Sequence, residues 1–189
     1  MRLVYLHGFN SSPASHKAQV LKAYLEARGL GACYACPALP PRAGEAVEEI
    51  ERLRPDRETC LVGSSLGGYY ATHVAEKHGC RAVLINPAID PHTGLQAYLG
   101  PQANLHTGAP YELTRAHLEA WRALWVGRID PERYLLLLET GDELLDWRRA
   151  VARYEGARMA IRQGGDHTLQ SFPEHLERIL AFARLPVRA

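Results

Sequence analysis

The sequence has almost no net charge and no long hydrophobic segment. Its 189 residues contain 22 Lys and Arg against 21 Asp and Glu, which gives a formal net charge of +1. This balance provides no electrostatic basis for binding nucleic acid or an anionic membrane surface. The apolar run Leu135 to Leu138 is far shorter than the roughly 20 residues that cross a bilayer. We therefore expect neither a nucleic-acid partner nor a membrane span.

Cysteine is scarce, and its spacing does not favour a metal site. Cys33 and Cys36 form a C-x-x-C pair, but Cys60 and Cys80 stand alone, whereas a zinc site usually needs a second close pair. A redox C-x-x-C would open a helix, yet Pro37 follows here and the segment is predicted as a strand. We expect reduced cysteines, no metal and no organic cofactor. The chain also begins directly with a predicted strand instead of a signal peptide, so we expect a cytoplasmic protein.

Short apolar strands alternate with helices along the whole chain. The composition, 47% hydrophobic and 23% charged, is that of an ordinary globular protein, and the length suits a single domain spanning residues 1–189. Nearly continuous apolar strands are typical of a parallel sheet that is covered on both faces. We predict an α/β fold, a three-layer α/β/α sandwich around a mostly parallel six-stranded sheet. The predicted strands are Arg2–Leu6, Ala32–Cys36, a strand from Thr59 up to a Gly-rich turn that contains Gly63 and Gly67, Arg81–Ile85, Tyr134–Glu139 and Arg158–Arg162.

Helices are predicted between these strands from their caps and apolar spacing. Ser12 suits an N-cap and Pro13 a first helical position, so a helix should begin there. Further helices are expected at Glu45–Arg54, from the Gly-rich turn to His78, at Glu143–Tyr154, and after a capping box at Ser171–Glu174. Residues 90–130 are irregular, with a helix predicted over Tyr111 to Val126. A connection of this length is often a lid, so we expect a cap-like insertion there.

The sharpest motif is Gly63-x-Ser65-x-Gly67, between a predicted strand and a helix. This is the nucleophile-elbow pattern, in which a serine at the tip of a strained turn needs small neighbours on both sides. The alternative interpretation is a structural turn without a catalytic role, because any Gly/Ser-rich turn between a strand and a helix can match this pattern. A catalytic serine would also need a base, an acid and oxyanion donors elsewhere in the chain.

Candidates for these roles follow other predicted strands. Asp142 comes after the fifth strand and His167 after the sixth, so the order Ser65, Asp142, His167 is that of α/β-hydrolases. Backbone N–H groups of Phe9 and Leu66 would bind the oxyanion. Taken singly, Asp142 could be only a helix N-cap and His167 only a loop residue. His7 is interpreted as a structural group that shapes the oxyanion loop.

Several segments together resemble the bacterial YqiA esterase family of small α/β-hydrolases. The resemblance covers nearly the whole chain and rests on Leu6 to Pro13, Val62 to Tyr70, Asn86-Pro87-Ala88, Thr140 to Glu143, and Gly164 to His167. It implies a Ser65–Asp142–His167 triad that hydrolyses small-molecule carboxylic esters, with acyl thioesters such as acyl-CoA as further candidates. Two alternatives remain open at this point. The same triad would serve a thioesterase or amidase, and a hydrolase fold can also be a non-catalytic binding module.

Overall fold

The computed structural model describes residues 1–185, and its centre is a six-stranded sheet in the order β2-β1-β3-β4-β7-β8. Every neighbouring pair in this sheet is parallel. The predicted six-stranded parallel sheet is therefore confirmed. Its strands are β1 (Arg2–Leu6), β2 (Tyr34–Ala35), β3 (Thr59–Ser64), β4 (Arg81–Ile85), β7 (Tyr134–Glu139) and β8 (Arg158–Arg162).

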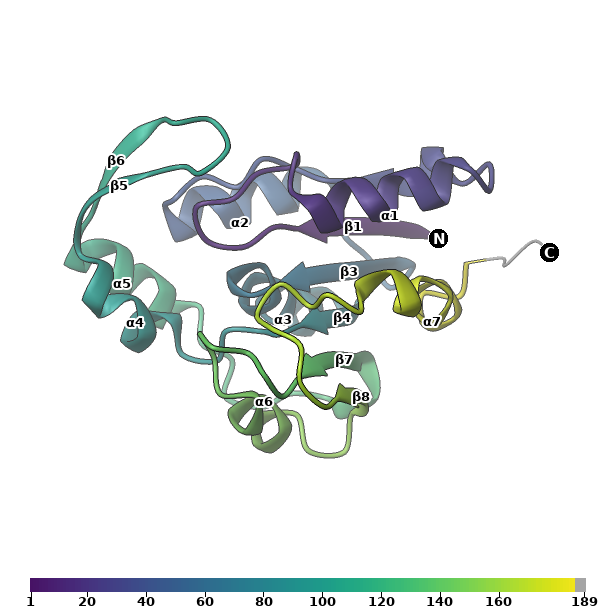
Figure 1. Ribbon diagram of the computed structural model, residues 1–189. Helices are drawn as coiled ribbons and strands as arrows, with labels where there is room; N and C mark the ends of the chain where they lie inside the picture. The colour runs from purple at the N-terminus through teal and green to yellow at the C-terminus, as the bar shows by residue number, and fades with distance from the viewer. Residues whose placement is uncertain (186–189) are drawn as a thin grey trace.

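Helices cover both faces of the sheet, which completes the expected α/β/α sandwich (Figure 1). One face packs against α1 (His16–Glu26) and α7 (Leu176–Phe182), and the other against α2 (Ala43–Arg52), α3 (Leu66–His78) and α6 (Trp147–Arg153). Successive side chains of a strand point to opposite faces of the sheet and so pack into two different cores. In β1, Leu3 and Tyr5 point to the α1 side, while Val4 and Leu6 point to the α3 side. Burying each such leucine stabilises the fold by about 1.5–3 kcal/mol.

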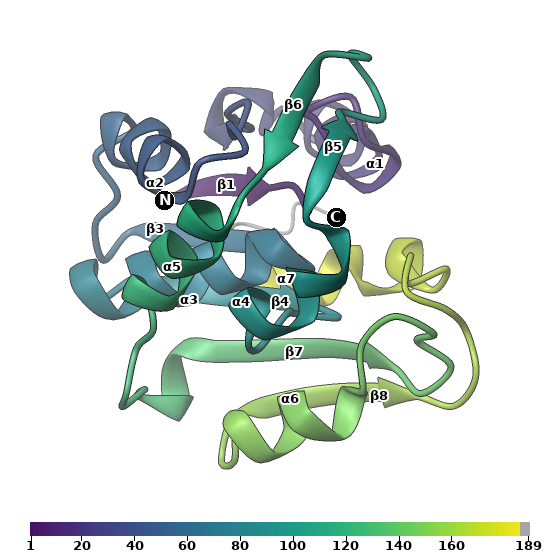
Figure 2. The same ribbon diagram turned by 90° about the vertical axis from the view of Figure 1, so that its left-hand side faces the viewer.

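The first part of the segment between β4 and β7, residues 91–123, lies at the carboxyl ends of the strands, facing the viewer in Figure 2. It consists of α4 (Pro91–Gly94), the 3₁₀-helix η2 (Leu95–Tyr98), the antiparallel hairpin β5 (Gly100–Ala103) and β6 (Pro110–Leu113), and α5 (Arg115–Ala123). The prediction of one helix over Tyr111 to Val126 is wrong at its start. Residues 110–113 pair with β5 instead, and Thr114 then caps α5 through a capping box with His117.

Local details correct other predicted boundaries. Helix α1 begins at His16, not at Pro13, because the Ser12 hydroxyl accepts from the N–H of Ala14 in a turn. Strand β2 has only two residues, since the 3₁₀-helix η1 (Gly31–Cys33) precedes it.

The predicted capping box at Ser171 is absent. Ser171 instead begins the 3₁₀-helix η4 (Phe172–His175) without a side-chain cap. Helix α6 starts at Trp147, four residues later than expected, and the 3₁₀-helix η3 (Pro131–Arg133) leads into β7. Among the helices that the structure describes, none is both long and apolar enough to cross a membrane.

Candidate active site

Ser65 lies at the tip of the turn between β3 and α3 in a strained conformation. Its φ is 53° and its ψ is −119°, angles that non-glycine residues rarely adopt. Hydrogen bonds hold this turn in place: Ser65 N–H donates to the Ile85 carbonyl at 2.9 Å, and the Ser65 carbonyl accepts from Gly68 and Ala88. The strain is thus balanced by contacts to β4 and the loop after it, which fix the position of Ser65.

The glycines around Ser65 are required by close backbone contacts. A β-carbon at Gly63 would lie 2.3 Å from the Gly67 carbonyl oxygen, and one at Gly67 would lie 2.0 Å from the Leu6 carbonyl oxygen. Neither site has room for a larger residue, because backbone atoms cannot move aside. Gly63 and Gly67 therefore allow α3 to pack directly against its own strand and the end of β1.

Asp142 and His167 meet across the ends of β7 and β8. The Nδ1 of His167 lies 2.9 Å from Oδ1 and 2.8 Å from Oδ2 of Asp142, and because a carboxylate only accepts, Nδ1 carries the hydrogen. The Asp142 side chain is 1% exposed. Its Oδ1 also accepts from the N–H groups of Leu144 and Leu145, at 2.9 Å each. The carboxylate is thus fixed by three donors. The interpretation of Asp142 as only a helix N-cap is wrong, because Asp146 holds the N-cap position of α6.

The loops that carry these two residues approach closely for a steric reason. Gly141 N–H donates to the Gly164 carbonyl at 2.8 Å. A β-carbon at Gly141 would lie 2.3 Å from the Gly165 carbonyl oxygen. Only glycine fits at position 141, and this close approach brings Asp142 within reach of His167.

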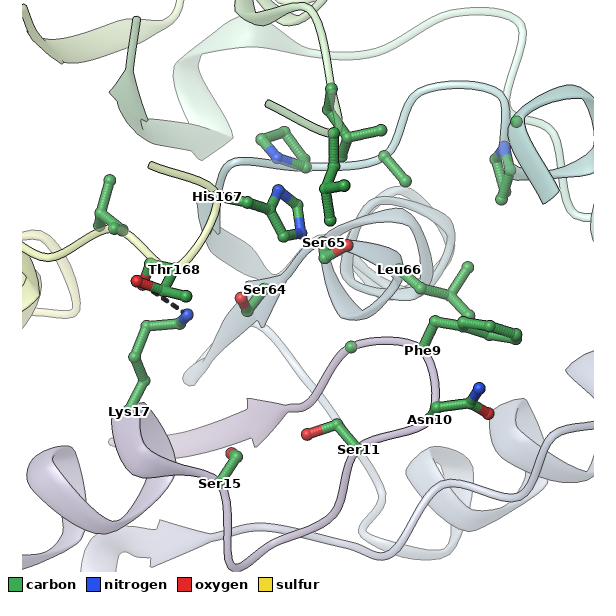
Figure 3. Close-up of a pocket in the computed structure, with 18 of the residues that line it drawn as sticks. Phe9, Asn10, Ser11, Ser15, Lys17, Ser64, Ser65, Leu66, His167 and Thr168 are labelled. Atoms are coloured by element: carbon green, nitrogen blue, oxygen red, sulfur yellow. Dashed lines mark hydrogen bonds between the residues drawn. The ribbon is translucent and has the colours of Figure 1, made fainter. Parts of the chain in front are cut away.

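Ser65 and His167 line the same pocket, and Figure 3 shows the imidazole beside the serine side chain. With Nδ1 bonded to Asp142, the remaining nitrogen, Nε2, is available to a group in the pocket. Among residues 1–185, no hydrogen bond joins Ser65 Oγ to the ring. Catalytic hydrogen bonds are often long in the absence of substrate and tighten when it binds.

Phe9 and Leu66 are the two candidate oxyanion donors. Leu66 is the first residue of α3, so its N–H has no partner within the helix, and Phe9 lies in the loop after β1, behind His7 and Gly8 in the chain. Both residues line the pocket (Figure 3). An anion there would gain from the two donors and from the positive end of the helix dipole.

His7 supports the loop after β1, which carries Phe9, and does so as a neutral imidazole. Its Nδ1 donates to the Gly8 carbonyl at 3.1 Å, and its Nε2 accepts from the N–H of Leu39 at 3.0 Å. Burial lowers the pKa of His7, which favours this neutral form. With both nitrogens engaged in the fold, His7 shapes the loop that carries Phe9, as the sequence interpretation has it.

Sequence reasoning missed a buried carboxylate behind the His167 loop. Glu139, the last residue of β7, is 1% exposed and accepts hydrogen bonds from the N–H groups of Asp166, Gln170 and Ser171 at 2.9, 3.2 and 3.0 Å. Burial favours a raised pKa for Glu139, but the hydrogen bonds from Ser171, Asp166 and Gln170 outweigh it and lower the pKa. The only signal in the sequence is a glutamate that ends a run of four leucines.

Asn86 completes this support. Its Nδ2 donates to the carbonyl oxygens of Asp166 and His167 at 3.1 Å, and its Oδ1 accepts from Glu139 N–H at 3.1 Å. The His167 loop is therefore held to β4 and β7 by two buried polar side chains. Their role depends on tertiary contacts, which is why a reading along the chain does not reveal it.

Ser65 opens into a pocket of about 980 Å³. Its walls come from the loop after β1, the start of α1, the segment 87–106, the loop after Asp142 and the loop after His167. This volume suits a small molecule that is largely enclosed. Within the described residues, no three His, Cys, Asp or Glu side chains are grouped closely enough to hold a metal ion.

A parallel sheet with a nucleophile elbow after β3 is the architecture of the α/β-hydrolase fold, and comparison with solved structures agrees. Alpha/beta hydrolase domain-containing protein 10 from mouse aligns with a TM-score of 0.70 at 16% identity, covering 95% of this chain and 87% of that one. Est1E from Butyrivibrio proteoclasticus with ferulic acid bound aligns with a TM-score of 0.64 at 13% identity, covering 96% of this chain and 88% of that one. At such identities the likeness establishes the fold.

The chain belongs to the uncharacterised protein family UPF0227, whose sequence pattern matches residues 2–184. A UPF0227 protein of Serratia proteamaculans is 24% identical over 191 residues, covering 97% of this chain and 99% of that protein. The UPF0227 protein YcfP of Salmonella paratyphi B is 23% identical over 188 residues, with the same coverage. The resemblance to the YqiA-type family of small α/β-hydrolases is thereby confirmed.

Proposed function

We propose that this protein is a serine hydrolase that cleaves carboxylic esters with Ser65 as nucleophile, His167 as base and Asp142 as the acid that orients it. One observation carries the proposal: the Asp142 carboxylate bonds His167 Nδ1 at 2.8 Å in a pocket that also contains the strained Ser65. A nucleophile, a base and an orienting carboxylate at three strand ends form the arrangement that activates a serine.

The first half-reaction transfers the acyl group to the enzyme. Nε2 of His167 takes the proton of Ser65 Oγ while Oγ attacks the ester carbonyl carbon. The carbonyl oxygen gains a negative charge, which the N–H groups of Phe9 and Leu66 stabilise. The C–O bond to the alcohol then breaks, and the alcohol oxygen takes the proton from His167. Each oxyanion donor of this kind is worth a factor of about 10²–10³ in kcat.

The second half-reaction returns the enzyme to its starting state. Water enters in place of the alcohol and loses its proton to Nε2 as its oxygen attacks the acyl carbon. The bond to Ser65 Oγ then breaks, and Oγ takes the proton back from His167. In both halves Asp142 stabilises the imidazolium and keeps Nδ1 protonated, so that Nε2 can act as the base.

The segment 90–130 is proposed as a cap that forms part of the acyl site. Leu95 and Tyr98, the two ends of η2, line the pocket together with Phe9. Phe9 and Tyr98 stack edge to face with ring centroids 6.2 Å apart. These apolar side chains would cover the acyl group of a bound ester and exclude water from it.

The direct test is labelling with a fluorophosphonate, which reacts with activated serines, together with hydrolysis of para-nitrophenyl butyrate. We expect a single adduct on the Ser65 peptide, and Ser65→Ala should lose the adduct and at least about 10⁴-fold of the hydrolysis rate. Circular dichroism and thermal unfolding confirm that the variant is folded. An adduct that maps to Ser64, or hydrolysis that survives Ser65→Ala, would contradict the proposal.

A further inference from the structure

The two sides of the pocket differ in chemistry. The side toward the cap is mostly apolar, with Phe9, Ile89, Leu95 and Tyr98 beside the polar Gln102 and His106. The side toward α1 and the His167 loop is mostly polar, and apart from Leu169, Phe172 and Pro173 it consists of polar side chains that include Tyr5, Ser11, Ser15, Lys17, Ser64 and Thr168. Figure 3 shows Lys17, Ser15 and Ser64 on the opposite side of Ser65 from Phe9. A substrate bound across Ser65 would therefore have one apolar and one polar half.

Lys17 is the unpaired charge on the polar side. Its ammonium donates to the Thr168 carbonyl at 2.7 Å, which leaves two N–H donors free, and no carboxylate among residues 1–185 lies within 4.0 Å of it. The Asp and Arg side chains of the wall form ion pairs. Arg149 pairs with Asp90, and Asp146 pairs with Arg148, which does not itself line the pocket. A negative ligand group would thus find one cation without a partner.

Hydroxyl groups and a helix end belong to the same pocket wall as this ammonium. Ser15 Oγ is buried and has no hydrogen-bond partner among residues 1–185, and Ser15 does not cap α1, although it holds the N-cap position. The first N–H groups of α1 and its positive dipole end therefore remain available on this side. Tyr5 and Ser64, 1% and 7% exposed, add hydroxyls to the same wall. Together they place several donors in the wall that contains this cation.

The nearby carboxylates of the protein do not lie in the pocket against the Lys17 ammonium. Burial lowers the pKa of Lys17, while Asp166, Glu139 and Asp142 act in the opposite direction. None of these three lines the pocket, and Glu139 and Asp142 already accept hydrogen bonds from the His167 loop and ring. An anionic ligand would offset the desolvation of the ammonium more directly, because it would lie against the free N–H groups.

The position of Lys17 identifies which half of the substrate it meets. In acyl transfer the leaving oxygen takes its proton from His167, so the alcohol lies toward the His167 loop. Lys17 contacts Thr168, the residue after His167. The apolar side near Phe9 and Tyr98 is left for the acyl group.

We propose that the alcohol half of the substrate bears an anionic oxygen group, a carboxylate or a phosphate, a few bonds from the scissile oxygen, and that Lys17 binds it with Ser15 and the N-terminus of α1. This specificity rests on the proposed esterase function. It assigns to Lys17 the selection of substrate, separate from the chemistry at Ser65.

Matched ester pairs with a common acyl group test the proposal. The carboxylate pair is meta-butyryloxybenzoate and the corresponding benzamide, whose neutral amide has a similar shape. The phosphate pair is butyryl glycerol phosphate and monobutyrin. For each pair we measure the ratio of kcat/KM, charged over neutral, in wild type, Lys17→Met, Lys17→Arg and the control Lys22→Met. Lys22 lies on the same helix but pairs with Glu26 away from the pocket.

We expect Lys17→Met to lower the ratio about tenfold for at least one pair, Lys17→Arg to keep most of it, and Lys22→Met to leave it unchanged. The pair with the larger loss distinguishes carboxylate from phosphate. Added salt should lower the wild-type ratio more than that of Lys17→Met. An unchanged ratio for both pairs would overturn the proposal. If kcat/KM itself fell equally for the charged and the neutral esters, Lys17 would serve only to hold Thr168 in place.

A binding measurement separates this inference from the proposed function. If wild type cleaved none of the esters, the esterase proposal would fail, and calorimetry would decide the question of Lys17 with two pairs of compounds, meta-hydroxybenzoate against meta-hydroxybenzamide and glycerol phosphate against glycerol. Tighter binding of the anion in either pair that is lost in Lys17→Met supports the anion site. Equal binding within both pairs, or no binding of any compound, overturns it.

Discussion

The hydroxyl of Tyr111 donates a hydrogen bond of 2.6 Å to Oδ1 of Asn10. Asn10 follows Phe9 and has a positive φ of 52°, and its Nδ2 donates to Gln102 Oε1 at 3.1 Å. Its carbonyl accepts from Leu105 N–H at 2.9 Å. The β5–β6 hairpin therefore holds the loop whose Phe9 N–H is proposed to bind the oxyanion, and the proposed cap is linked to the chemistry through these bonds.

Removal of the Tyr111 hydroxyl should weaken this link. We expect Tyr111→Phe to lower kcat by about threefold to tenfold on esters of every chain length, because one hydrogen bond is worth about 0.5–1.5 kcal/mol. Steady-state kinetics provides kcat and KM separately. Tyr24→Phe is the matched control, since the Tyr24 hydroxyl has no hydrogen-bond partner in the part of the chain that the structure describes. A loss confined to long acyl chains would assign Tyr111 to substrate binding instead.

Glu139 should make the stability of the protein depend on pH. Its pKa in the folded state lies below the unfolded value of about 4.5, so it contributes stability above that value, and the contribution is lost as the pH falls through the folded pKa. We expect Glu139→Gln to cost about 2–4 kcal/mol at neutral pH, because an amide nitrogen would face backbone donors, and less as the pH falls below the unfolded pKa.

Urea unfolding of wild type and Glu139→Gln from neutral pH down to about pH 4 measures this difference. Glu177→Gln, an exposed position on α7, is the control and should show no such trend. A difference that stayed constant over this pH range would mean that the carboxylate charge is not what holds the His167 loop.

The segment 90–130 contains two kinds of apolar residue. Leu95 and Tyr98 line the pocket, whereas Trp121 is fully buried and donates its indole N–H to Tyr70 at 2.6 Å. We expect Leu95→Ala and Tyr98→Ala to change the preference among acetate, butyrate and octanoate esters with little loss of stability. Trp121→Ala should cost about 3–5 kcal/mol of stability. If Leu95→Ala and Tyr98→Ala lowered activity equally on every ester, the segment would be only a small satellite core.

The sequence predicts the sheet well because its signals are local. Arg2–Leu6, Arg81–Ile85, Tyr134–Glu139 and Arg158–Arg162 form strands with the predicted bounds, since each apolar run is closed by turn residues. Helix starts were less accurate. At Ser12 the hydroxyl stabilises a turn instead of the helix, and at Pro110 to Leu113 pairing with β5 overrides helical spacing.

The residues of the candidate site also fall into two groups, those that local sequence patterns predict and those that depend on tertiary contacts. Ser65, Asp142 and His167 can be proposed from motif, order and position at strand ends, and the structure brings the last two into contact. Their assignment as a triad stays a prediction until it is tested. Asn86 and Glu139 support the His167 loop through contacts that span 27 to 81 positions along the chain. Lys17 reaches Thr168 across 151 positions. No local pattern records such contacts.

The last prediction concerns the carboxylate that orients His167. Asp142 is bonded to His167 Nδ1, whereas Asp90 pairs with Arg149 and Asp146 caps α6 by accepting from Arg148 N–H. We expect Asp142→Asn to keep the fold and lower kcat by about 10²–10⁴, because an amide facing Nδ1 favours the tautomer in which Nε2 carries the proton and cannot act as a base. Asp90→Asn and Asp146→Asn, measured with the same ester, should each cost less than about tenfold, or 1.4 kcal/mol. A severe loss in Asp90→Asn together with a mild one in Asp142→Asn would place the acid after β4. The close approach of Gly141 to Gly165, which brings Asp142 to His167, would then serve only the packing of the two loops.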